Sequence, residues 1–97
     1  MSRSFEFHPA AEAEVLEAEA WYLERSAVAA RAFVHEVNHV IEQMIEAPER
    51  WPPFEQGTRR IVFPTFPFTL IYRIKPDVIE IVAVAHQSRR PGYWKSR

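Results

Sequence analysis

Two runs of β-branched and aromatic residues, Phe68–Lys75 and Val78–His86, most strongly constrain how this chain can fold. They flank the turn sequence Pro-Asp, and this pattern predicts a β-hairpin. The proline cannot take the positive φ of a type I′ turn, so a tight two-residue turn is not expected. A four-residue loop would place Arg73 opposite Glu80, whereas a three-residue loop would not.

Strict alternation along a strand divides the side chains of each run between two faces. In the first run one face carries Phe68, Leu70, Tyr72 and Ile74. In the second run one face carries Ile79, Ile81, Ala83 and Ala85, and the other carries Val78, Glu80, Val82, Val84 and His86. Both faces of the second run are largely apolar, so we expect an inner strand that is covered on both sides.

The segment before the hairpin has the pattern of two helices, Ala10 to Arg25 and Ala27 to Ala47, with Ser26 as the N-cap of the second. Their expected core stripes are Ala11, Val15, Ala18 and Tyr22, then Ala30, Phe33, Val34, Val37, Ile41 and Met44. Short strands are expected at residues 3–8 and 58–63. The predicted fold class is α+β in the order β-α-α-β-β-β. A helical hairpin packs on a small, mainly antiparallel sheet in one domain of residues 1–97.

The composition limits which cellular compartment and which kinds of partner are expected for this chain. The chain has no cysteine, which excludes disulfides and thiolate metal sites and suits a reducing cytoplasm. It has no apolar run of the ~20 residues that a membrane span needs, so no membrane partner is expected. Residues 59–97 carry eight basic and two acidic side chains, a net charge of +6. This half is expected to meet an anionic partner, unless its cations only protect a sheet edge.

The sequence His35-Glu36-Val37-Asn38-His39 matches the H-E-x-x-H motif of zinc proteases. The spacing puts both histidines on one helical face, but that face lies opposite the predicted core stripe. A zinc hydrolase needs its motif in a cleft with a third ligand. We therefore treat a metal-binding hydrolase as a remote alternative and expect neither a metal nor another cofactor.

A second group of residues gathers around the hairpin and its exit: Arg59, Arg60, Arg73, His86, Arg89, Arg90 and Tyr93. RNA cleavage needs a base, an acid and cations on the phosphorane. His86 could act as the base or the acid near pH 7. The planar guanidinium group of arginine suits the bidentate binding of phosphate. A cross-strand ion pair with Glu80 is the structural alternative for Arg73. The arginines are expected to form one basic surface.

The Phe-Pro-Phe-x-x-x-Tyr-Arg-Ile of residues 66–74 and the Val-Ala-His-x-x-Arg-Arg-Pro-x-Tyr-Trp of residues 84–94 resemble the RelE/ParE superfamily of type II toxins. The resemblance spans nearly the whole chain. It implies a growth-inhibiting toxin of plasmid-stabilisation modules, held in a hetero-oligomer by a cognate antitoxin. Partner-binding residues would be Arg59, Arg60, Arg89, Arg90 and Trp94.

Two activities divide this superfamily. ParE-like members poison DNA gyrase, whereas RelE-like members cleave mRNA in the ribosomal A site. For the RelE-like alternative, the resemblance implies Arg73, His86 and Tyr93 as catalytic residues. The second-strand lysines of the ribonucleases are absent, with Arg59 and Arg60 roughly in their place. The Arg-Arg-Pro-x-Tyr-Trp ending also favours the ParE-like, non-catalytic interpretation.

Overall fold

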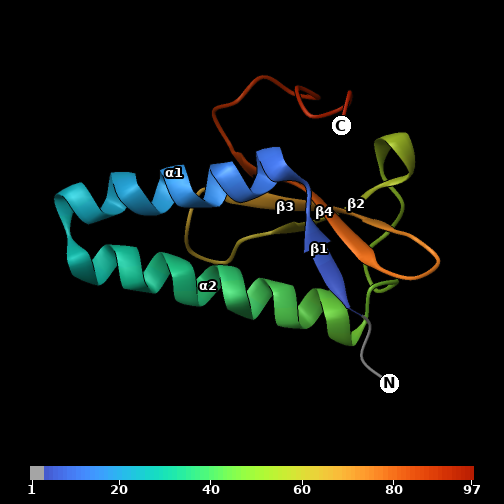
Figure 1. The fold of residues 1–97 in the computed structure, drawn as a ribbon, viewed down its shortest axis with the longest axis horizontal. Helices are drawn as coiled ribbons and strands as arrows, with labels where there is room; N and C mark the ends of the chain where they lie inside the picture. The colour runs from blue at the N-terminus through green and yellow to red at the C-terminus, as the bar shows by residue number, and fades with distance from the viewer. Residues whose placement is uncertain (1–3) are drawn as a thin grey trace.

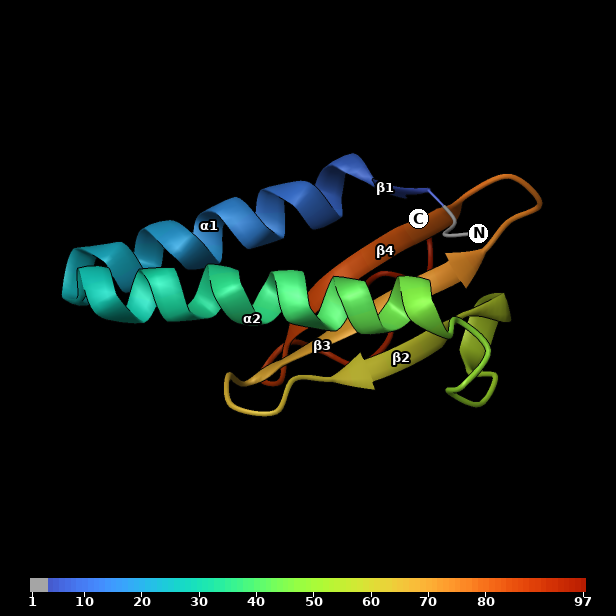
Figure 2. The ribbon, with the colours of Figure 1, turned by 90° about the horizontal axis from the view of Figure 1, so that it is seen from below.

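The structure is a computed structural model that describes residues 4–97. Two helices form one layer, a four-stranded sheet forms the second, and residues 87–97, called the tail here, lie against the sheet's other face (Figure 1, Figure 2). The elements are β1 (Phe5–Phe7), α1 (Pro9–Arg25), α2 (Ala27–Glu46), the 3₁₀ turn η1 (Glu55–Gly57), β2 (Arg59–Val62), β3 (Phe68–Ile74) and β4 (Ile79–His86). The predicted α+β class and element order are confirmed.

The helical hairpin is defined by its caps. His8 caps α1, since its Nδ1 accepts the N–H of Ala10 at 3.1 Å, and Pro9 occupies the first helical position. Ser26 ends α1 and begins α2: its N–H donates to the carbonyl of Tyr22, and its hydroxyl accepts the N–H of Ala29. The predicted N-cap is confirmed, and the two helices are joined through a single residue.

The predicted core stripes of both helices are also confirmed. Ala11 is fully buried, and Val15, Ala18 and Tyr22 pack on the same core. On α2 the expected positions pack inward together with Val40, which the predicted stripe omitted. The stripes bury the inner face of the hairpin against β3 and β4.

The sheet has the order β1-β4-β3-β2. The pairs β2–β3 and β3–β4 are antiparallel, and the short β1 lies parallel to the first part of β4. The strand predicted at residues 3–8 is shorter in the structure, and its first residue, Arg3, lies outside the described residues. β4 is therefore an inner strand only as far as Ile81, where β1 ends.

The β3–β4 hairpin closes through four residues, 75–78, and Arg73 pairs with Glu80 as that loop length predicts. The predicted faces of β4 are wrong beyond Val82. Ile71 pairs with Ala83 and Tyr72 with Ile81, so one extra residue bulges out of β4.

The bulge exchanges the faces of the second half of the strand. Val84 joins Ile79 and Ile81 on the helix side, while Ala83 packs on the opposite core. That second core lies under the tail and also contains Ile71, Val82 and Trp94.

Candidate partner-binding site

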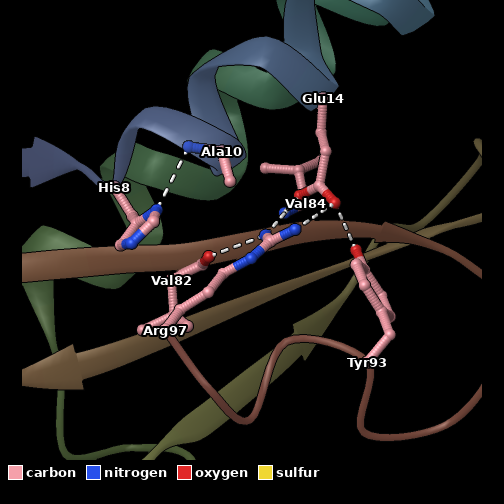
Figure 3. Close-up of polar contacts among 7 residues, drawn as sticks. All are labelled: His8, Ala10, Glu14, Val82, Val84, Tyr93 and Arg97. Atoms are coloured by element: carbon pink, nitrogen blue, oxygen red, sulfur yellow. Dashed lines mark hydrogen bonds and ion pairs between the residues drawn. The ribbon is translucent and has the colours of Figure 1, made fainter.

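Glu14 of α1 holds the tail against the sheet (Figure 3). Its carboxylate accepts hydrogen bonds from the Tyr93 hydroxyl at 2.5 Å and from the Arg97 guanidinium at 3.0 and 3.1 Å. It also accepts the backbone N–H of Val84 at 3.0 Å. We call Glu14, Tyr93 and Arg97 the clasp. The Glu14 and Arg97 side chains are only 12% and 15% exposed, so the pair is shielded from water.

The clasp also fixes the protonation state of Tyr93. Burial raises the pKa of Tyr93, and the hydrogen bond to Glu14 and its negative charge raise this pKa further. Arg97 and Arg89 oppose these effects, and the Arg89 guanidinium lies 3.9 Å from the centre of the Tyr93 ring. Tyr93 is thus a neutral hydrogen-bond donor whose proton is directed at Glu14.

A groove of about 510 Å³ lies beside the clasp, between α1 and the last residues of β4. Its apolar lining comes from Ala18, Trp21, Phe68 and Val84, among others, and its polar lining includes His86 and Arg89. The central carbon of the Arg25 guanidinium lies 3.6 Å from the centre of the Trp21 ring, and Trp21 is 52% exposed. An exposed aromatic residue over an apolar floor is the composition of a binding groove.

Of the three residues proposed for ribonuclease chemistry, His86 and Tyr93 line the same groove, whereas Arg73 lies apart from them. Arg73 lies five residues along β3 from Phe68, the pairing partner of His86, which is about 17 Å of strand. Arg73 forms an ion pair with Glu80 at 3.0 Å. The Nδ1 atom of His86 accepts the N–H of Ser88, so one ring nitrogen is already engaged. The Tyr93 hydroxyl belongs to the clasp.

The expected single basic surface is also divided. Arg59 pairs with Tyr72, so it faces the helix side, where its guanidinium donates to the carbonyl of Trp51. Arg60 is on the other face, 4.2 Å from the centre of the Phe54 ring. Arg89 and Arg90 are exposed beyond the far end of β4. The prediction of one continuous surface is therefore wrong, and partner binding by each arginine stays a prediction.

Trp94 is not placed as a contact residue. It is 3% exposed and packs on Ile71, Val82 and Ala83, with the Phe54 ring 6.1 Å away. A partner could not reach its side chain while the tail is in this position. Its role here is to hold the tail on the sheet.

The H-E-x-x-H sequence has a structural role at its glutamate. His35 and His39 are exposed, as their helical face predicts. One carboxylate oxygen of Glu36 accepts the N–H groups of Thr65 and Phe66, at 3.1 and 2.8 Å. Glu36 therefore fastens the β2–β3 turn to α2. Among residues 4–97, no three His, Cys, Asp or Glu side chains come close enough together to hold a metal ion.

The sequence comparison decides the family. The family model described as "ParE toxin of type II toxin-antitoxin system, parDE" matches residues 5–91. The chain belongs to the ParE toxin family. A solved structure described as "Chromosomal ParDE TA system from P. aeruginosa" has the same fold, with a TM-score of 0.63 and 18% identity. The match covers 88% of this chain and 96% of that one. No curated protein sequence gives a match.

Two acidic residues of this ParE-family chain were not singled out from the sequence as organising residues. Glu14 is one of several glutamates on α1, and Glu36 was weighed only as part of a zinc motif. The one available signal for Glu14 is its phase, because it lies three residues after Ala11 and four before Ala18 on the core stripe.

Within residues 4–97, no helix combines the length and apolarity needed to cross a bilayer.

Proposed function

We propose that this ParE-family toxin is neutralised by a cognate antitoxin in a hetero-oligomer and that it inhibits DNA gyrase without catalysing a reaction. The family match over residues 5–91 carries the proposal. The matched Pseudomonas structure is described as a ParDE toxin–antitoxin system, which supports an antitoxin as the partner of this chain. Gyrase as the target follows from the resemblance to ParE-like toxins.

The arrangement of the candidate catalytic residues supports the non-catalytic choice. A ribonuclease needs an acid, a base and a phosphate-binding cation around one phosphodiester. Here Arg73 is neutralised by Glu80 and lies about 17 Å along the strand from the His86 position. The raised pKa of Tyr93 also makes it a weaker acid.

The deciding experiment separates the two targets in cells. The chain is induced in a sensitive host, and mRNA integrity, translation and the DNA-damage response are followed separately. We expect growth arrest with DNA breaks that depend on gyrase and with intact mRNA. A gyrase allele resistant to ParE-type inhibition should restore growth. Rapid mRNA cleavage before any DNA damage would contradict the proposal.

Two variants sharpen this test. Arg73→Gln and His86→Gln should leave growth arrest unchanged, because neither side chain takes part in a reaction. Arg73→Gln removes one of the two ion pairs of Glu80, which keeps its pair with Lys75 at 3.4 Å, so the protein should remain folded. Co-expression with the antitoxin encoded beside the gene should restore growth and yield a complex that survives gel filtration. A harmless chain in the sensitive host would contradict the toxin assignment.

A further inference from the structure

The outer edge of β4 is a sheet edge that side chains cover. β1 pairs with β4 only at Ile79 to Ile81, and the N–H of His8 makes the last backbone hydrogen bond on this edge, to Ile81. Beyond it, the Arg97 guanidinium donates to the carbonyl of Val82 at 3.1 Å. Glu14 accepts the N–H of Val84 (Figure 3). The clasp thus supplies the donor and the acceptor that a neighbouring strand would supply.

The same edge continues into the groove. The N–H of Gln87 donates to the carbonyl of Pro67, so the backbone groups of Gln87 point towards β3. Alternation then directs those of Val84 and His86 outward. Val84 and His86 line the groove, together with the apolar side chains of Phe68 and Trp21. Backbone groups and an apolar floor lie side by side, which is the arrangement that accepts an extended peptide.

The charges indicate the chemistry of such a peptide. Arg89 lies on the tail side of the groove, and Arg25 stands at its other end on Trp21. Glu17 lies on the α1 wall. When a strand takes the N–H of Val84 and the carbonyl of Val82, Arg97 loses its carbonyl acceptor. An acidic side chain directed towards the tail would meet Arg89.

We propose that the β4 edge from Val82 to His86 accepts an extended, acidic segment of a partner protein as an added strand, and that the clasp opens to admit it. Naming the antitoxin as this partner rests on the proposed function. The closed clasp competes with the incoming strand for the same two backbone groups. Opening the clasp by mutation should therefore strengthen binding, which is the opposite of the usual result of removing an interface arginine.

The size of the effect follows from the competition. The apparent dissociation constant is the intrinsic one divided by the fraction of molecules whose edge is open. Arg97 makes three hydrogen bonds in the closed clasp, two of them to a carboxylate. Loss of one charge-assisted bond of ordinary strength raises the open fraction about tenfold. Arg97→Ala should therefore bind about tenfold more tightly than the wild-type chain.

The test uses the full chain and the full-length antitoxin encoded beside its gene. Affinities are measured for the wild type, Arg97→Ala and the matched control Lys95→Ala. Lys95 carries the same charge on the same tail, but it pairs with Glu55 in an exposed contact at 2.6 Å and does not touch the β4 edge. We expect tighter binding for Arg97→Ala and no change for Lys95→Ala. Equal behaviour of the two variants would overturn the proposal.

Amide hydrogen exchange gives a second measurement that needs no variant. In the wild-type complex the His86 amide should become protected at least tenfold over the free chain, whereas amides on α2 should not change. A complex in which the amides from Val82 to His86 exchange as in the free chain would overturn the strand site alone. Failure of the wild-type chain to form any complex would overturn the proposed function and this site together.

Discussion

Replacement of Glu36 by alanine should unfasten the β2–β3 turn from α2. The Glu36 carboxylate accepts two backbone N–H groups, those of Thr65 and Phe66, about thirty residues along the chain. These are the contacts through which this side chain reaches the sheet. If Glu36 instead belonged to a metal hydrolase site, the same replacement would lower activity without lowering the stability of the fold. A stability measurement therefore separates the two interpretations.

The magnitude follows from the two hydrogen bonds. A hydrogen bond to a charged group contributes about 1.5–3 kcal/mol when it is shielded from water. Thr65 is exposed and Phe66 is half-buried, so water replaces part of each interaction. We therefore take about 1 kcal/mol for each bond, below that range, and expect Glu36→Ala to reduce the free energy of unfolding by about 2 kcal/mol. For a domain of this size that corresponds to a fall in Tm of roughly 10 °C.

Urea unfolding followed by circular dichroism measures this difference directly. Glu36→Gln keeps one acceptor oxygen and should lose about half as much stability as the alanine variant. His35→Asn and His39→Asn are the controls, since both side chains are exposed, and each should change stability by less than about 0.5 kcal/mol. A Glu36→Ala variant as stable as the wild type would refute the structural role, and so would losses of equal size in the histidine variants.

Three further predictions address protonation, the strand ion pair and the basic residues. Burial raises the pKa of Tyr72 to about 12 although Arg59 opposes it, so stability should be lost as pH rises from about 10 to 12. Over this pH range the free energy of unfolding of Tyr72→Phe should fall by about 1 to 2 kcal/mol less than that of the wild type, as measured by urea unfolding. Arg73→Gln should lower the free energy of unfolding by about 0.5–1 kcal/mol without altering growth arrest. Arg89→Glu should weaken antitoxin binding at low salt far more than Arg31→Glu, and equal losses would mean that only net charge matters.

Much of the fold could be predicted because its signals are local. The Pro-Asp turn, the two apolar runs and the break at Ser26 each act within a few residues. The helix stripes were correct because a 3.6-residue period leaves little freedom in which face is buried. The loop length was left open between three and four residues, and the four-residue loop of the structure gives the pairing of Arg73 with Glu80.

The bulge in β4 could not be predicted, because no residue in the sequence demands it. Val82, Ala83 and Val84 are all apolar and small enough to be buried on either face. They are only 0–1% exposed, which shows that both cores accept them. A β-bulge shifts alternation by one residue, so every expectation about faces beyond it was reversed. The outward-facing Val84 amide and the clasp on it are consequences of that shift.

The basic half of the chain illustrates why net charge is a poor guide to a surface. Of its eight cations, Arg73, Lys75, Lys95 and Arg97 form ion pairs with glutamates. Arg59 is bonded to backbone carbonyls of the loop before β2. The field that remains comes from separate positions and is screened within about 10 Å at 0.1 M salt.

Charge of this kind can steer a partner towards the molecule, but it cannot align a peptide on it. The β4 edge can do so, because its donors and acceptors repeat at the spacing of a strand and its groove adds apolar contact. Antitoxin binding by strand addition would therefore tolerate single charge losses at Arg60 or Arg90. It would respond sharply to whatever opens or closes the Glu14 clasp.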